Sequence, residues 1–406
     1  MMGYLHKSVS FLLFFVIFKI TIVENIKNKS FLYVKTYYFS EYQNNKHLFP
    51  FRQKNNNSNK YPSYLTDKNN QIFNNISLNK KTYDETYEII CNELELLKKE
   101  NSDNISHIQT FLGFIEKYYH EIKKHNSCSP EIFLKLFLKY IETFKKYRYY
   151  SFHNVHKYDE SLYEWSLEFW LPLIDQKNSR FLGTNNIKKI NNWIEQGHNV
   201  FIFSNHHIEA DANIIKYYFH INNAENISRN MVFIGGHKIR VDPLSRPFTV
   251  SANILCIYSK KYIEYPPHLK EEKILFNHKS LNALKNMLSL GKTIIWVAPS
   301  GGRDRKSQDN EIQISPFDPK IIKTFNIFAK RSNVKTHFVG MALNTYNICP
   351  PPNTIDIDEI EKERSCSYSP VGLNLGDDIF DIYPQMGENE ITYKIYDYVN
   401  DLYKKI

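Results

Sequence analysis

The stretch VFIFSNHHIEADANIIKYYF, residues 200–219, decides the fold. It opens with a short apolar run, Val200–Phe203, of the length of a buried strand. A polar turn follows at Ser204, and a helical stretch then runs from Ala212 to Phe219. A strand, a turn and a helix in this order predict one unit of an α/β fold.

The same alternation of short apolar runs and helical stretches continues beyond Phe181. It predicts an α/β domain over residues 173–406, with a parallel or mixed central sheet and helices on its faces. In such folds a ligand site forms at the carboxyl ends of the strands. Polar clusters that directly follow the apolar runs are therefore expected to share one site. The predicted strands are Val200–Phe203, Met231–Ile234, Ile254–Tyr258, Thr293–Val297 and His337–Leu343.

Residues 81–172 have the apolar spacing of helices instead. Apolar side chains recur at intervals of three and four residues, as in Ile90, Leu94 and Leu97. Four helical stretches are predicted here, and Pro172 closes the last of them. Four helices of this length predict a small N-terminal bundle domain.

The turn after Val200–Phe203 carries candidate catalytic residues. If it places His206 ahead of the helix and Asp211 in the first helical turn, the carboxylate reaches one imidazole nitrogen. The other nitrogen then faces the pocket as a base, and the carboxylate stabilises the imidazolium. In the alternative, the histidine only ends a strand and the aspartate only caps a helix. A metal site that adds His207 and Glu209 is disfavoured, because adjacent histidines rarely point at one ion.

A second cluster, APSGGRDR at residues 298–305, follows the apolar run Thr293–Val297. Its glycines allow the backbone to pass close to a ligand, and Arg303 and Arg305 can clamp a phosphate through bidentate hydrogen bonds. The alternative is a surface turn whose arginines pair with the neighbouring acid or point to water. Ser300 does not lie in the GxSxG motif that positions the nucleophile of a serine hydrolase. We therefore expect it to be an ordinary turn residue.

Two further stretches could border the same pocket. YSKKY, at residues 258–262, ends another predicted strand and adds positive charge, although alone such a run is usually a solvated rim. The prolines that follow Cys349 fix an extended loop that would wall the pocket. A rigid surface loop is the alternative for this segment.

The composition and charge of the chain favour some classes of binding partner over others. The formal net charge of +9 suits an anionic substrate, an acidic carrier protein or a membrane surface as partner. A protein without any such partner can also carry this charge. Nucleic acid is the least favoured partner, because the lysines are scattered and no run of basic and aromatic residues resembles an RNA-binding signature. The five cysteines include no CxxC pair, which argues against a disulfide framework or a structural zinc site.

Four motifs of this chain resemble those of the plant chloroplast glycerol-3-phosphate acyltransferases, a branch of the glycerolipid acyltransferases with an NHx4D motif. That family has stretches similar to SNHxxEAD, ADPLxxPF, CxYSKKH and IAPSGGRDR. The likeness runs in the same order and spacing from about Pro172 to Pro352. The corresponding stretches here are SNHHIEAD (204–211), VDPLSRPF (241–248), CIYSKKY (256–262) and VAPSGGRDR (297–305).

The resemblance implies a fold and a set of roles. It implies a four-helix N-terminal domain packed on an α/β acyltransferase domain, with His206 as general base and Asp211 as its orienting partner. Tyr262 stands where the family has histidine; it can donate a hydrogen bond but carries no positive charge. His207 stands where the plant sequences have glutamine. The phosphate ligands that the resemblance implies are Lys261, Tyr262, Arg303 and Arg305.

The implied reaction moves a fatty acyl group from acyl carrier protein or coenzyme A to the sn-1 hydroxyl of glycerol 3-phosphate, which gives lysophosphatidate. This is the first step of plastid phospholipid synthesis, and no cofactor is expected. Because NHx4D is shared more widely, an acyltransferase for lysophosphatidate or another phosphorylated acceptor stays open. So do a noncatalytic lipid- or phosphate-binding protein and peripheral contact with a membrane.

The first 80 residues resemble a targeting leader. A basic stub ends at Lys7, and the apolar run Val9–Phe18 is short for a membrane span but suits a signal peptide, which we predict over residues 1–24. Residues 25–80 are rich in Asn, Lys, Ser and Tyr and poor in acids, which predicts a disordered transit-type leader. Together they resemble the bipartite address of a secondary plastid such as an apicoplast. A plain secretory signal with a disordered spacer, or an uncleaved membrane anchor, is the alternative.

Overall fold

The computed structural model describes residues 81–100, 105–146, 154–242, 244–352, 363–387 and 390–406. These residues belong to one compact unit. The predicted signal peptide (1–24) and leader (25–80) lie outside the described residues. Among the helices that are described, none is both long enough and apolar enough to cross a membrane.

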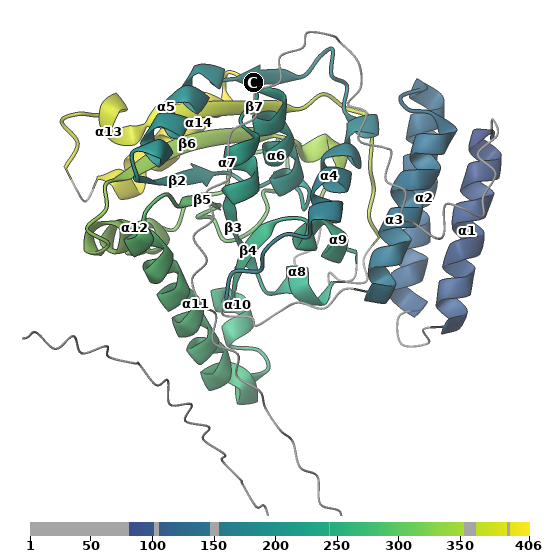
Figure 1. Ribbon diagram of the computed structural model, residues 1–406, viewed down its shortest axis with the longest axis horizontal. Coiled ribbons are helices and arrows are strands. Elements are labelled where there is room, and N and C mark those ends of the chain that lie inside the picture. Colours follow the sequence, from purple (N-terminus) through teal and green to yellow (C-terminus); the bar gives the residue numbers. More distant parts are fainter. Residues whose placement is uncertain (1–80, 101–104, 147–153, 243, 353–362, 388–389) are drawn as a thin grey trace, which may run out of the picture. The chain divides into compact units, whose positions relative to one another are not determined.

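The described residues of the C-terminal part form a seven-stranded mixed sheet in the order β1-β7-β6-β2-β5-β3-β4 (Figure 1). β7 runs antiparallel to β6, and the other pairs are parallel. The prediction of an α/β fold with a mixed sheet is therefore confirmed. The strands are β1 (Arg180–Leu182), β2 (Asn199–Ser204), β3 (Val232–Gly236), β4 (Asn253–Ile257), β5 (Ile294–Val297), β6 (Thr336–Asn344) and β7 (Gly372–Asp378).

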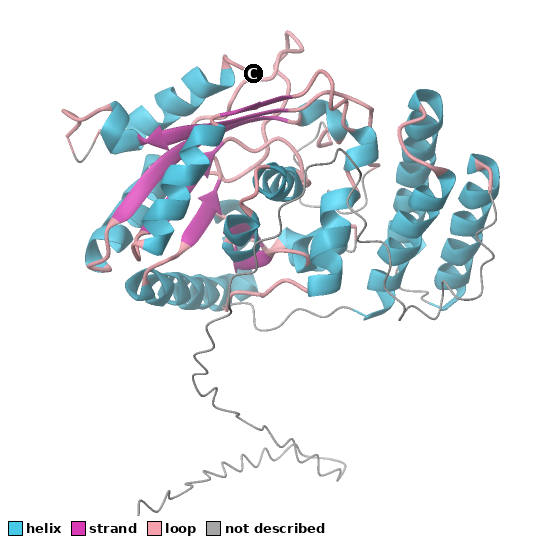
Figure 2. Ribbon diagram, turned by 45° about the horizontal axis from the view of Figure 1, so that its top comes forward, coloured by secondary structure: helices cyan, strands magenta, loops and turns pink. Residues whose placement is uncertain are grey.

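Helices cover both faces of this sheet (Figure 2). The first face is covered by α5 (Thr184–Glu195), α6 (Asp211–Ile221) and α7 (Glu225–Asn230). The second is covered by α11 (Lys270–Leu290), α12 (Pro319–Arg331), α13 (Ile379–Ile382) and α14 (Ile391–Tyr403). A short helix, η3 (Leu171–Leu173), precedes β1, and the other short helices lie between strands: α8 (Lys238–Val241), α9 (Arg246–Val250), α10 (Lys260–Ile263), η4 (Pro267–Leu269) and η5 (Tyr346–Ile348).

β2 lies in the middle of the sheet, and every one of its residues is buried. Side chains alternate between the two faces of a strand. Val200 and Ile202 accordingly pack with α5, α6 and α7, whereas Phe201 and Phe203 pack with α11, α12 and α14. The ring of Phe201 stacks on Phe325 of α12 with 5.2 Å between centroids. Burial on both faces explains why this strand reads as a continuous apolar run.

Two strands were not predicted from the sequence. β1 has only three residues, and none of them is buried. β7 reads GLNLGDD, which mixes glycines and polar residues with only two leucines. Neither segment has the apolar run or the alternation that signals a strand. They form because β6 offers an open side, with Leu343 opposite Leu373 of β7, and β1 then pairs with β7.

Helices fill the described residues of the N-terminal part where they were predicted. They are α1 (Tyr83–Glu100), α2 (Ile105–His125), α3 (Pro130–Lys146) and α4 (Glu160–Glu168). The start of α4 is fixed by Asp159, whose carboxylate accepts hydrogen bonds from the backbone amides of Ser161 (2.9 Å) and Leu162 (3.3 Å). The grouping of these helices into a separate four-helix bundle domain, 81–172, stays a prediction.

One apolar cluster joins these helices to the sheet-bearing part. It includes Phe137 of α3, Phe169 just after α4, and Ile208 and Ile214 from the segment around the candidate base. Phe248 of α9 belongs to the same cluster, with its ring centroid 5.0 Å from that of Phe169. The helices therefore support the back of the turn that carries the candidate catalytic residues.

Replacing Phe248 with Ala tests this support. The ring is 8% exposed and lies 5.3 Å from Trp165 and 5.2 Å from Trp170. We expect the free energy of unfolding to fall by about 3–5 kcal/mol, as is usual for a buried Phe→Ala change. Urea denaturation measures this value. Tyr393→Ala, at a ring that is 66% exposed, is the control, and an equally small loss in both variants would contradict the packing role.

Candidate active site

The structure places His206 and Asp211 in direct contact. β2 ends at Ser204, a short turn carries the histidine, and α6 begins at the aspartate. Nδ1 of His206 lies 2.7 Å from Oδ2 of Asp211. Because a carboxylate only accepts, Nδ1 carries the proton and Nε2 is left as the basic nitrogen. The imidazole is 25% exposed, whereas the carboxylate is fully buried.

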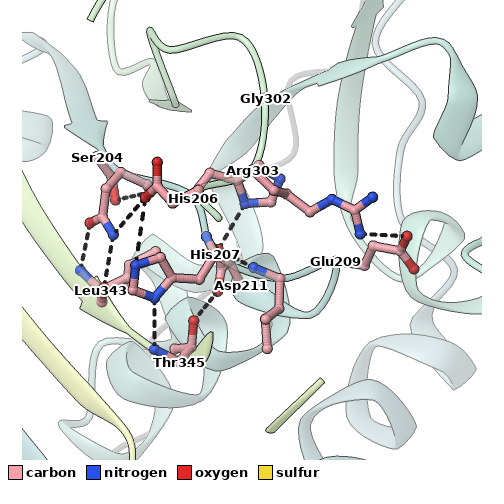
Figure 3. A network of polar contacts seen from close by, with 12 residues as sticks. Ser204, His206, His207, Glu209, Asp211, Gly302, Arg303, Leu343 and Thr345 are labelled. Atoms are coloured by element: carbon pink, nitrogen blue, oxygen red, sulfur yellow. Dashed lines mark hydrogen bonds and ion pairs between the residues drawn. The ribbon is translucent and has the colours of Figure 1, made fainter. Parts of the chain in front are cut away.

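Asp211 is held from several sides. Its Oδ2 also accepts hydrogen bonds from the backbone amides of His207 (2.7 Å) and Ile208 (3.1 Å), and its Oδ1 accepts one from the Thr345 hydroxyl (2.5 Å). Figure 3 shows these groups gathered around the carboxylate. Burial alone would raise the pKa of Asp211, but the hydrogen bonds that its carboxylate accepts from His206 and Thr345 outweigh it and lower that pKa. Asp211 therefore stays ionised.

The loops after three adjacent strands are tied together here. Asn205, after β2, both donates to and accepts from the backbone of Leu343 in β6, at 2.8 Å each. The backbone amide of Asp304, after β5, donates to the carbonyl of His206 at 2.6 Å. The Asp304 carboxylate accepts from the backbone amide of Ser315 at 2.8 Å. The polar residues thus meet at the carboxyl ends of β6, β2 and β5, where the sequence predicted one site.

Arg303 reaches the same turn through Glu209. Its Nη1 donates to Oε1 of Glu209 at 2.8 Å, and Arg364 donates to the same oxygen at 3.2 Å. Arg364 also lies 3.5 Å from the carboxylate of Asp242. Burial would raise the pKa of Glu209, but the charges of Arg364 and Arg303 lower it to about 2. The guanidinium of Arg303 therefore faces an ionised carboxylate beside the His206–Asp211 pair.

Arg305 lies on the other side of the same loop. Its Nη1 donates to the carbonyl of Arg303 at 3.0 Å, and its Nε donates to the carbonyl of Pro352 at 3.4 Å. The proline segment after Cys349 thus contacts the arginine loop. Ser300 donates to the carbonyl of Gly302 at 2.9 Å, inside the turn.

Tyr262 belongs to a second group, around His237. The two rings meet edge to face at 4.7 Å, and Nζ of Lys238 lies 5.1 Å from the tyrosine ring centroid. Lys273 donates to the backbone carbonyl of Tyr262 at 2.7 Å. Burial and the charges of Lys273 and Lys238 lower the pKa of His237 to about 4, so this ring is neutral. The side chain of Lys261 lies outside the described part of the structure.

The sequence analysis missed three members of the site. Thr345 directly follows β6, so it could have been found as one more polar residue at a strand end. Asp304 lies inside the quoted arginine motif but was not assigned a role. Arg364 reaches Glu209 from 155 positions along the chain, and no local pattern signals such a contact.

A model of the acyltransferase family matches residues 180–348, from the start of β1 to the end of η5. A chloroplastic glycerol-3-phosphate acyltransferase of Cucurbita moschata is 38% identical over 215 residues, which are 52% of this chain and 47% of that protein. The chloroplastic enzymes of the same name from Arabidopsis thaliana (32% over 234 residues; 57% and 50%) and Spinacia oleracea (32% over 242 residues; 59% and 49%) are also similar.

This chain spans about half the length of these curated relatives. The matched segment contains the His206–Asp211 pair, Arg303 and Thr345, whereas Arg364 lies beyond the family match. Residues 180–348 therefore match an acyltransferase-family domain, and the chain is similar to the chloroplastic glycerol-3-phosphate acyltransferases over about half of its length.

Proposed function

We propose that this chain is a glycerol-3-phosphate 1-O-acyltransferase, which transfers a fatty acyl group from acyl carrier protein or coenzyme A to the sn-1 hydroxyl and yields lysophosphatidate. One observation carries the proposal. A histidine backed by a buried carboxylate (2.7 Å) lies on the same turn as Glu209, which Arg303 contacts at 2.8 Å. A base beside a guanidinium suits an acceptor that has both a hydroxyl and a phosphate.

In the proposed reaction, Nε2 of His206 takes the proton of the 1-hydroxyl while its oxygen attacks the thioester carbonyl carbon. The carbon–sulfur bond then breaks, and the thiolate leaves and takes the proton from the imidazolium. Asp211 stabilises the imidazolium in between, because the carboxylate is buried and ionised. No covalent acyl-enzyme is required, and the sequence of proton transfers returns His206 to its starting state.

The phosphate would bind at Arg303. In the free protein this guanidinium is 13% exposed and pairs with Glu209, so the phosphate dianion competes with a carboxylate for it. A phosphate can accept two parallel hydrogen bonds from one guanidinium, which favours the exchange. Arg364 can balance the negative charge of Glu209 while the phosphate takes its place at Arg303. Arg305, Lys261 and Tyr262 remain proposed phosphate ligands.

The remaining assignments follow from the sequence and the relatives. We propose acyl carrier protein as a partner, glycerol 3-phosphate as substrate, peripheral contact with a membrane and no cofactor. The relatives are named as chloroplastic enzymes, and the acid-poor leader of residues 25–80 supports a plastid, of the apicoplast type, as the location. The substrate and the partner in these assignments belong to one reaction, in which an acidic carrier protein delivers the acyl group to an anionic acceptor.

The direct test is acyl transfer by the purified protein, with carrier-protein or coenzyme A thioesters as donors and glycerol 3-phosphate or lysophosphatidate as acceptors. We expect lysophosphatidate to form from glycerol 3-phosphate. His206→Ala should lower kcat by about 10²–10⁴-fold, the usual contribution of a positioned base. His278→Ala, on the exposed side of α11, is the matched control and should leave kcat unchanged.

Each other outcome has a definite meaning. Transfer only to lysophosphatidate would make the chain an acyltransferase with a different acceptor. Phosphate binding without turnover from any donor would favour the noncatalytic alternative. Full turnover by the His206→Ala variant would remove that residue as the base.

Arg303→Ala tests the phosphate site. We expect the KM for glycerol 3-phosphate to rise by roughly 10–100-fold, because a charge-assisted hydrogen bond to a charged group contributes about 1.5–3 kcal/mol. The value of kcat should change much less than KM, since the base is untouched. Steady-state kinetics at saturating acyl donor measures both values. Arg331→Ala, at the exposed end of α12, is the control, and an unchanged KM in Arg303→Ala would contradict the assignment.

A further inference from the structure

His207 directly follows the proposed base, but it turns away from solvent. Its side chain is fully buried. The backbone amide of Thr345 donates to its Nδ1 at 3.2 Å, so Nδ1 has no proton and Nε2 carries it. Nε2 in turn lies 3.5 Å from a carboxylate oxygen of Asp304, close enough for electrostatic attraction, although among the described residues it makes no hydrogen bond. Figure 3 shows the ring between Thr345 and the turn that carries the base.

The surroundings keep this ring neutral. Burial lowers the pKa of His207; the carboxylates of Asp211 and Asp304 act in the opposite direction, and His206 adds to the lowering. Tyr346 of η5 and Tyr403 of α14 meet the ring edge to face, with centroids 6.0 and 5.7 Å away. A proton on Nδ1 would point at the amide of Thr345 and remove the hydrogen bond that this amide donates.

The contacts of His207 lead to the catalytic pair by two routes. Its own backbone amide donates to Oδ2 of Asp211 at 2.7 Å. Its ring fixes the backbone of Thr345, whose hydroxyl donates to Oδ1 of the same carboxylate at 2.5 Å. The carboxylate therefore accepts one hydrogen bond from the His207 backbone and one from Thr345, whose backbone donates to the His207 ring. Asp211 in turn orients His206.

We propose that His207 is a positioning residue, which as the neutral Nε2–H tautomer ties Thr345 to the Asp304 loop and thereby fixes the Asp211 carboxylate behind the base. The kinetic part of this proposal rests on the proposed function, whereas its structural part does not. An apolar side chain of similar size would leave the amide of Thr345, which is 1% exposed, without its acceptor. Glutamine has both an acceptor oxygen and a donor amide, so it can replace the two contacts without titrating.

The kinetic test compares His207→Met with His207→Gln in the full chain. The Met variant should lose about 10–100-fold in kcat, with the KM for glycerol 3-phosphate changed by less than about 3-fold, because positioning of the base is impaired and the phosphate site is not. The Gln variant should recover most of kcat. His220→Met, a partly buried histidine at the far end of α6, is the control. Equal activity in the Met variant and the wild type would overturn the proposal.

The pH profile separates positioning from simple packing. Because burial lowers the pKa of His207, its ring takes up a proton only toward the acid end of the profile. The wild type should therefore lose kcat/KM more steeply there than the Gln variant, which has no titrating side chain at this position. An acid limb as steep in the Gln variant as in the wild type would mean that protonation of His207 does not disturb the catalytic pair, which would contradict the positioning role.

Nitrogen-15 NMR of histidine-labelled protein tests the structural part without any activity. In the wild type, His207 should show an unprotonated Nδ1 and a protonated Nε2. The signal of the His206 Nδ1 proton, which is hydrogen-bonded to Asp211, should persist in the Gln variant and be lost or shifted in the Met variant. The opposite tautomer of His207, or an unchanged His206 signal in the Met variant, would overturn the proposal. Correct NMR signatures in a protein that transfers no acyl group would defeat the proposed function alone.

Discussion

The carboxylate of Asp211 is charged in a place that water does not reach. A buried charge is tolerated only when it is fully hydrogen-bonded. Here the donors come from His206, from two backbone amides of the turn and from the Thr345 hydroxyl. The end of β2, the start of α6 and the residue after β6 must therefore keep one arrangement. That same arrangement leaves Nε2 of His206 as the basic nitrogen.

A second group of paired charges lies beside the Asp211 carboxylate. The carboxylates of Glu209 and Asp242 face the guanidinium groups of Arg303 and Arg364. Two anions and two cations can be buried together at much lower cost than either sign alone. For an anionic acceptor this means that binding is an exchange of partners at Arg303. Discrimination between phosphate and other anions then depends on how well each replaces Glu209.

How well the sequence predicts a feature depends on how far apart along the chain the interacting residues lie. The five apolar runs and the helical stretch from Ala212 are local, so periodicity was enough to predict them, whereas the contact of His206 with Asp211 was one of two alternatives that the turn left open. β1 and β7 were not predicted because they are short or polar, and because β7 forms against β6 and β1 against β7. The contact between Arg364 and Glu209 also escaped prediction, since it joins positions 155 residues apart. In the sequence His207 stood out only because the plant sequences have glutamine at its position, whereas its burial and its contact with Thr345 come from the fold.

The central claim is that a buried, ionised Asp211 makes His206 a base of defined tautomer. Asp211→Asn tests it most directly, because the amide keeps the shape but can donate to Nδ1 and so favours the wrong tautomer. Acyl transfer to glycerol 3-phosphate is the measurement, together with the urea unfolding midpoint to verify the fold. The account predicts a loss of about 10³–10⁴-fold in kcat, comparable to the same change in a serine protease triad. Turnover near that of the wild type in a folded variant would contradict it.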